Sequence, residues 1–158
     1  MAEQTNGVEI VLREYPNVTY WLKGRQVLGA GNLILTTRRL ICLNRVALAD
    51  WQLDRIRELS EAGFHQLTDF ALKLHKNNFQ IPLERISGVR LGLFPMFPFP
   101  RLCMRVHHQG PRKKSVPMET GFWFRIPILK GLVQLEITLV MGWIRAVKQA
   151  TRARQGSS

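Results

Sequence analysis

Histidine and aspartate side chains are the first candidates for metal or acid–base chemistry in this chain. His107 and His108 are adjacent on a predicted strand, so their side chains point to opposite faces and cannot both bind one metal ion. His65 and Asp69 are spaced to share one face of a helix, but the sequence places no third ligand beside them. We therefore predict an exposed pair at His65 and Asp69, and no metal site.

The chain also lacks the motifs of common catalytic and nucleotide-binding sites. The glycines at 29 and 31 are not followed by the third glycine of a dinucleotide loop, and they lead into a strand pattern. Cys42 and Cys103 are far apart in apolar stretches, which favours buried thiols over a zinc site or a reactive pair. No phosphate-binding Gly-Lys-Ser/Thr loop or nucleophile elbow occurs. The sequence thus indicates a binding module without a cofactor, not an enzyme.

The charge balance favours anionic partners. Lysine and arginine number 23 against 11 acidic residues, which gives a net charge of +12 and a pI of about 10.9. Such a field attracts nucleic acid, anionic lipid or acidic protein surfaces without choosing between them. A generally basic composition is the alternative explanation. The basic residues of the C-terminal segment, Arg145, Lys148, Arg152 and Arg154, are explained by the dipole of a predicted helix without a ligand.

Two loops concentrate basic side chains. Lys23 and Arg25 lie in an early connection between strands, and Arg112, Lys113 and Lys114 lie in the turn of a later hairpin. Together they are the predicted ligand-binding residues, at one end of the fold. A solvated turn is the simpler interpretation of the second cluster.

Residues 91–100 form the most unusual segment, with three prolines among large apolar side chains. Prolines disfavour a regular strand or helix, so we predict an apolar loop. Exposed apolar patches mark interaction sites, and the basic residue that follows suits anionic headgroups. The predicted membrane or partner contacts are Phe94, Met96, Phe97, Phe99 and Arg101. The alternative is that the loop folds back over the body of the domain.

The length of 158 residues fits one domain with a core of its own. The most apolar region, residues 121–144, is interrupted by Arg125, Lys130 and Glu136, so no membrane span is predicted. The polar start of the chain gives no sign of export, which favours a cytoplasmic location with peripheral membrane association.

Alternating and helical patterns suggest a mainly β domain. Strands are predicted over residues 8–13, 18–23, 33–35, 39–46, 79–89, 102–108 and 115–118. Proline and asparagine at 16 and 17 are interpreted as a break between the first two strands. Apolar residues at helical spacing predict helices within residues 49–76 and over residues 132–150.

Two stretches resemble a known family. Residues 31–40, GNLILTTRRL, resemble the Gly-x-Leu-x-Leu-Thr-x-x-Arg-Leu hairpin of GRAM and related pleckstrin-homology-like domains. Residues 81–89, IPLERISGV, resemble the Ile-Pro-Leu-x-x-Ile-x-x-Val strand of the same family. Cys42 departs from the aromatic residue that the family usually has at that position.

The resemblance implies an antiparallel barrel of two bent sheets capped by a C-terminal helix, with Trp143 packed against one open end. Residues 1–154 would form this domain, residues 49–76 a helical insertion, and residues 155–158 a frayed tail. Lys23 and Arg25 supply only part of the family's phosphoinositide motif.

For function, the resemblance implies peripheral association with anionic membrane surface or lipid headgroups. The alternative is a protein-interaction adaptor that uses the apolar loop or the helical insertion. Nucleic-acid binding is the third class, and it is disfavoured because Phe94, Phe97 and Phe99 lie in a proline-rich loop and not on a basic sheet face.

Overall fold

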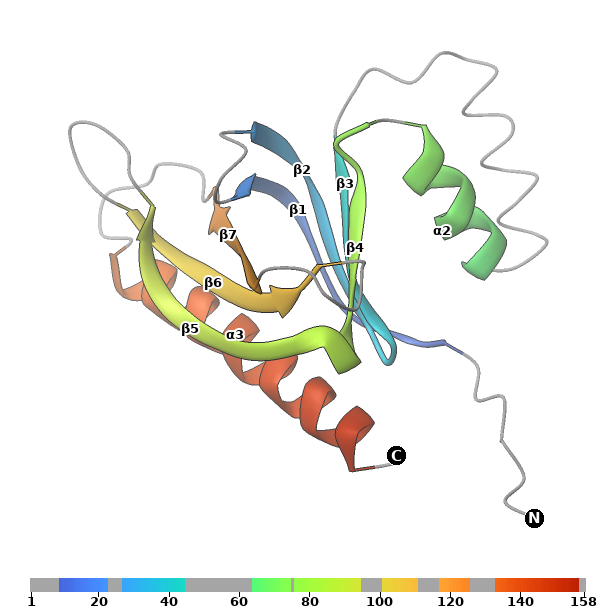
Figure 1. The fold of residues 1–158 in the computed structure, drawn as a ribbon. Coiled ribbons are helices and arrows are strands. Elements are labelled where there is room, and N and C mark those ends of the chain that lie inside the picture. The colour runs from blue at the N-terminus through green and yellow to red at the C-terminus, as the bar shows by residue number, and fades with distance from the viewer. Residues whose placement is uncertain are drawn as a thin grey trace.

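Seven antiparallel strands and a long C-terminal helix form the body of the domain (Figure 1). The computed structural model describes residues 9–22, 27–44, 64–74, 76–94, 101–110, 117–125 and 133–156. The strands are β1 (Val11–Leu22), β2 (Val27–Thr36), β3 (Arg39–Asn44), β4 (Phe79–Pro82), β5 (Ile86–Phe94), β6 (Arg101–Gln109) and β7 (Pro117–Phe124). The helices are α2 (Phe64–Lys73), α3 (Val133–Gln155) and the short 3-10 helix η1 (Leu83–Arg85). The mainly β prediction with a closing helix is confirmed.

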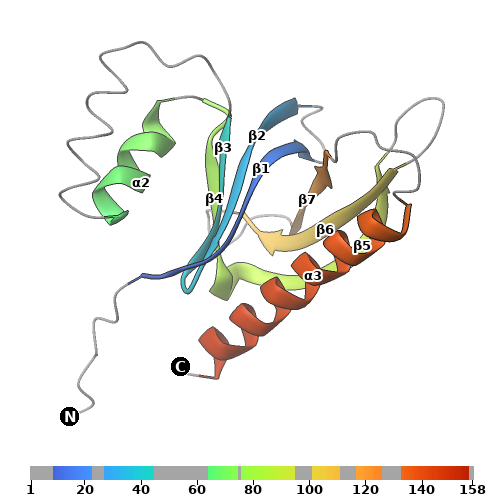
Figure 2. The same ribbon diagram turned by 180° about the vertical axis from the view of Figure 1, so that it is seen from behind.

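The strands form one continuous sheet in the order β4-β3-β2-β1-β7-β6-β5, with β4 and β5 at its edges. The sheet is strongly bent, so β5 and β6 cross the direction of β1 to β4 (Figure 1). Seen from behind, α3 runs along β5 and β6, while α2 lies beside β4 (Figure 2). Because η1 joins β4 directly to β5, the two edges of the sheet approach each other at that corner.

Alternating side chains build the core inside the bend. Leu33, Leu35 and Leu40 are fully buried there, on strands β2 and β3. The two cysteines are also buried, and burial raises the pKa of each thiol. This environment matches the inert thiols predicted from the sequence.

Trp143 anchors α3 to the core. Its side chain is fully buried, and its ring centroid lies 5.5 Å from that of Phe124 on β7. The guanidinium of Arg13 lies 5.3 Å from the centre of the Trp143 ring on the side of β1. The helix therefore closes the core through one large aromatic contact supported by its neighbours.

The predicted break at residues 16 and 17 is wrong, because β1 continues through it. The pairing of β1 with β2 shifts register between Pro16 and Val18, and Asn17 has a φ of 84°. Asparagine tolerates this left-handed conformation, and proline cannot donate a ladder hydrogen bond. The pair thus forms a bulge within one long strand.

The boundaries of the later strands also differ from the prediction. The strand expected over residues 79–89 is interrupted by η1 after Pro82. Conversely, β5 continues to Phe94, so the first four positions of the predicted 91–100 loop belong to a strand. The first proline of that segment is at position 95. Residues 91–94 contain no proline, so they can pair as part of a strand. β7 extends past Met118 to Phe124.

Arg39 connects the helical segment to the sheet. Its Nε lies 3.0 Å from the Glu9 carboxylate, and its Nη1 lies 3.1 Å from the Asp69 carboxylate on α2. Asp69 is therefore paired with an arginine, and the side chain of His65 lies outside the described residues. The contact gives Arg39 a structural role.

Replacing Trp143 by alanine is expected to lower the free energy of unfolding by about 3–5 kcal/mol, because it removes a fully buried ring. Trp143→Phe is the matched control. It should cost less, since phenylalanine retains an aromatic contact with Phe124 and the buried Trp143 Nε1 has no hydrogen-bond partner to lose. Urea denaturation measures both values. A loss below about 1 kcal/mol for the alanine variant would contradict the anchoring role.

His108 predicts a specific pH dependence of stability. Burial lowers its pKa below the ordinary value of 6.5, and its Nε2 lies 3.0 Å from the Thr120 hydroxyl. The unfolded chain thus binds a proton more readily than the folded one, so stability is constant above about pH 6.5 and falls as the pH drops below it. Urea denaturation between about pH 8 and pH 5 should show this loss, and His108→Gln should reduce it. An unchanged pH profile in the variant would refute the assignment.

Candidate binding site between β5 and α3

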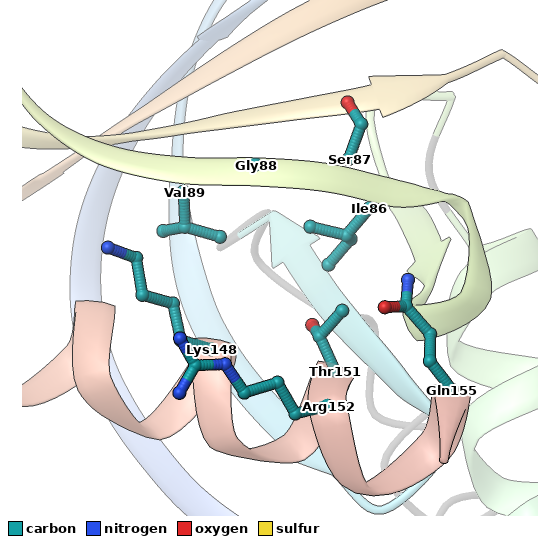
Figure 3. Close-up of a pocket in the computed structure, with 8 residues that line it drawn as sticks. All are labelled: Ile86, Ser87, Gly88, Val89, Lys148, Thr151, Arg152 and Gln155. Atoms are coloured by element: carbon teal, nitrogen blue, oxygen red, sulfur yellow. The ribbon is translucent and has the colours of Figure 1, made fainter. Parts of the chain in front are cut away.

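A cavity of about 260 Å³ lies between the start of β5 and the last turns of α3 (Figure 3). We call it the β5–α3 groove. It is lined by Ile86, Ser87, Gly88 and Val89 of β5 and by Lys148, Thr151, Arg152 and Gln155 of α3. The four helix residues recur at intervals of three and four, which places them on one flank of α3. The groove therefore has a strand as one wall and a polar helix flank as the other.

The base of the groove is apolar and its rim is basic. Ile86 and Val89 are buried in the core, whereas Lys148 and Arg152 are exposed. Figure 3 shows Lys148 extending toward Val89. Neither cation has an acidic partner within the described part of the chain. Two uncompensated positive charges beside a recess provide a site for an anionic group.

Thr151 adds a second, independent feature that points to a ligand. The residue is only 8% exposed, and its Oγ1 is buried without a hydrogen-bond partner among the described residues. Figure 3 shows this side chain between Lys148 and Gln155, on the flank that faces β5. A buried hydroxyl without a partner costs free energy, and a bound carboxylate or phosphate would accept its hydrogen bond.

The strand wall of the groove is an open sheet edge. Within the described residues β5 pairs only with β6, so the backbone groups on its other side have no strand partner. β5 has nine residues and no proline, whereas the opposite edge strand β4 has four residues and ends in Pro82. The edge of β5 beside the groove is therefore longer and less protected than that of β4.

The lining residues include two cations and two hydroxyl groups. Lys148 is the one titratable acid–base group of the groove apart from the arginine, and no histidine, cysteine or carboxylate lines it. In the portion of the chain that is described, no cluster of three or more such residues is arranged to hold a metal ion. The groove offers cations, a hydroxyl and backbone groups.

Most of the predicted site residues cannot be compared with this groove. Those outside the described residues are Lys23, Arg25, Arg112, Lys113, Lys114, Met96, Phe97 and Phe99. Phe94 is the last residue of β5 and lies opposite Arg101, the first residue of β6. The Arg101 guanidinium lies 3.8 Å from the carboxylate of Glu136, near the start of α3. Arg101 thus contacts the helix, although its side chain remains 45% exposed.

From the sequence, Lys148 and Arg152 were explained by the helix dipole, and the groove was not predicted. The polar residues at 148, 151, 152 and 155 formed a detectable stripe beside the apolar face of the predicted helix. Their proximity to an edge strand was not detectable, because it depends on how α3 crosses the sheet.

The outer face of the sheet carries another cluster. Trp21 lies across Gly121, and the Arg105 guanidinium lies 5.5 Å from the Trp21 ring. Arg105 also donates a hydrogen bond to the Leu93 carbonyl at 2.8 Å and lies 3.4 Å from the Glu119 carboxylate. Aromatic and basic side chains therefore do share a face of the sheet, whereas the sequence-based argument against nucleic-acid binding assumed that they do not. Arg105 is engaged by neighbours within the fold, which favours a structural role.

His107 and His108 lie on opposite faces, as predicted. His107 Nε2 is 3.3 Å from Glu119 on the outer face, and His108 lies inside against Thr120. The two rings therefore cannot share a ligand.

No protein-family model matches the chain, and no curated protein is significantly similar to it. The resemblance of residues 31–40 and 81–89 to GRAM domains therefore remains an interpretation of those two stretches. None of the helices in the described residues is long and apolar enough to cross a membrane.

Thr151→Val tests whether the groove is built for a ligand. Valine keeps the shape and removes a hydroxyl that has no partner in the free protein, so the free energy of unfolding should rise by about 1 kcal/mol. The same change should weaken binding of anions, because it removes a donor. Urea denaturation and calorimetric titration with inorganic phosphate provide the two readouts. Thr138→Val, on an exposed part of α3, is the binding control. A variant that is less stable would show that Thr151 has a structural partner.

Proposed function

We propose that this chain is a non-enzymatic binding module with a pleckstrin-homology-like barrel, and that it binds an acidic segment of a partner protein in the β5–α3 groove. The observation that carries the proposal is the combination of Lys148 and Arg152, which form no ion pair within the described residues, with the buried Thr151 hydroxyl beside a strand edge that has no partner strand among them.

The barrel assignment is supported by strand order and by sequence. A bent sheet of seven antiparallel strands followed by a helix with a buried tryptophan is consistent with that architecture. The stretches at 31–40 and 81–89, which resemble the family's motifs, lie in the hairpin β2–β3 and in the connection from β4 to β5. Functional assignment still depends on the site, because one fold serves many functions.

An extended protein segment uses more of the groove than a lipid headgroup does. A headgroup phosphate would engage Lys148, Arg152 and Thr151, but it would leave the backbone groups of β5 unpaired. A peptide with an acidic side chain would satisfy both the cations and the strand edge. The runner-up among the predicted functions, a protein-interaction adaptor, therefore becomes the leading one, with a different contact surface from the apolar loop or the helical insertion.

Association with anionic membranes is the second candidate. It is supported by Leu91 and Leu93, which are 43% and 53% exposed on β5, close to the exposed cation Arg101. These residues adjoin the apolar 95–100 segment that was predicted to enter a bilayer. Lys23, Arg25, Arg112, Lys113 and Lys114 would supply the electrostatic attraction.

Charge reversal separates the two candidates. The double variant Lys148→Glu with Arg152→Glu should weaken binding of a fluorescent glutamate-rich peptide by about tenfold per cation, as measured by fluorescence anisotropy at low salt. Lys73→Glu with Lys76→Glu is the matched control, since it changes the net charge equally at exposed positions on or next to α2. The control should bind the peptide nearly as well as the wild type.

A vesicle arm completes the experiment. Co-sedimentation with phosphatidylserine and phosphatidylcholine vesicles is measured for the same proteins and for Arg112, Lys113 and Lys114 reversed to Glu. If the peptide does not bind and the hairpin reversal abolishes binding to anionic vesicles, the membrane candidate replaces the groove. If the groove variant and its control lose peptide binding equally, the groove is not the site.

A further inference from the structure

We infer that α2 is a detachable cover of the outer face of β3, held closed by the ion pair between Arg39 and Asp69, and that it opens without unfolding of the sheet. The cover lies on the face opposite the core, so it is independent of the proposed function of the β5–α3 groove. Three features support it: a buried apolar side chain on the outer face, an ion pair that can be broken at little cost, and a tether at the end of α2.

The outer face of β3 carries an apolar residue that is out of contact with water. Side chains alternate between the two faces of a strand. Leu40 and Cys42 belong to the hydrophobic core, so Arg39 and Ile41 point to the outer face. Ile41 is nonetheless fully buried, and it pairs there with Ile34 of β2. A fully buried isoleucine outside the core means that the chain covers this face from the solvent side.

Of the described elements, α2 is the one that lies on this face. Both ribbon views show it beside β4, on the side of the sheet away from α3 (Figures 1 and 2). Arg39 contacts Asp69 of α2 from the same face as Ile41. Ala71 of α2 is buried, whereas Asp69 and Lys73 on either side of it are exposed. α2 therefore turns an apolar flank toward the sheet and a polar flank toward solvent.

The ion pair between α2 and the sheet can be broken at little cost. The Asp69 side chain is 61% exposed, so water solvates its carboxylate once α2 leaves. Arg39 keeps its other carboxylate, because its Nε lies 3.0 Å from Glu9, whose side chain is only 1% exposed. No buried charge therefore loses its partner, which is the event that makes the loss of an ion pair expensive. Exposed ion pairs contribute little to stability, so this one holds α2 closed only weakly.

Dissolved salt can reach this ion pair. Arg39, Asp69 and Glu9 border one cavity of about 310 Å³. At about 1 M salt the Debye length falls to about 3 Å, so the attraction between Arg39 and Asp69 is largely screened. Burial of apolar side chains in the core does not depend on charge, and the sheet remains folded under these conditions. High salt should therefore release α2 selectively.

Asn78 tethers the end of α2 to the sheet. Its Nδ2 donates to the Ala71 carbonyl at 2.6 Å, and its Oδ1 accepts from the Asn44 backbone nitrogen of β3 at 2.6 Å. The Tyr20 hydroxyl donates to the neighbouring Asn77 carbonyl at 2.9 Å. This connection keeps the released helix next to the sheet. A helix of ten residues is not stable without packing, so α2 unwinds when it detaches.

Hydrogen exchange followed by mass spectrometry tests the opening. The amides of α2 should exchange at least about tenfold faster than those of β2 and α3, because α2 opens locally. Raising NaCl from about 0.05 M to about 1 M should speed exchange of α2 by about two- to fivefold and leave β2 and α3 unchanged. Asp69→Asn should have the same effect at low salt. Glu14→Gln, which removes an exposed carboxylate from β1, is the matched control and should not.

Thiol labelling tests what α2 covers. Ile41→Cys places a thiol under the helix, while the native Cys42 and Cys103 are buried and report global unfolding. A maleimide should modify the new thiol alone, and about two- to fivefold faster at high salt or together with Asp69→Asn. Intact-mass spectrometry counts the labels on each chain. Leu12→Cys, at an exposed position of β1, should react rapidly at either salt concentration.

The outcomes distinguish local opening from its alternatives. If α2 exchanges as slowly as β2, the helix is an integral part of the fold and the cover is wrong. If the thiol of the Ile41→Cys variant reacts only together with both native cysteines, the opening is global unfolding. If salt and Asp69→Asn change neither rate beyond the Glu14→Gln control, the ion pair does not hold the cover closed. Each of these results overturns the inference and leaves the acidic-peptide test of the groove unaffected.

Discussion

Packing of α3 against the bent sheet is the interaction on which the rest of this structure depends. The sheet has a concave apolar face that needs a cover, and α3 supplies it through Trp143 and the buried residues one turn on either side, Val140 and Val147. Phe124 and Arg13 fix the tryptophan from β7 and β1. Because the helix is held in this way, its polar flank is fixed beside β5, and the groove follows from the same packing that completes the core.

The groove combines groups that have no partner within the described fold. Proteins satisfy most buried polar groups, and they protect most sheet edges. Among the residues that the structure describes, the Thr151 hydroxyl has no hydrogen-bond partner, Lys148 and Arg152 form no ion pair, and β5 pairs with a strand on one side only. The outer face provides a useful contrast, since Arg105 there is held by an aromatic ring, a carboxylate and a carbonyl group. Arg105 on the outer face has partners within the fold, whereas the cations and the buried hydroxyl of the groove have none among the described residues. This difference is the physical reason for assigning binding to the groove.

The sequence was most informative where side-chain periodicity alone decides the structure. The alternation around Leu33 and Leu35 and the apolar face that includes Trp143 predicted a strand and a helix that the structure confirms. Local rules failed where pairing overrides them. Pro16 and Asn17 became a bulge because β2 pairs with β1 both before and after Asn17, and residues 91–94 became a strand because β6 pairs with them.

By itself, the amino-acid sequence determined a basic, mainly β chain with a closing amphipathic helix, because composition and side-chain period depend only on the order of residues. It also presented Lys148, Thr151 and Arg152 as one polar stripe on that helix. Tertiary structure alone decided what the stripe faces. The angle at which α3 crosses the sheet and the position of β5 at an edge arise from long-range strand pairing, which local sequence patterns do not encode. That pairing placed two cations and a hydroxyl without partners beside a strand edge that is free within the described residues.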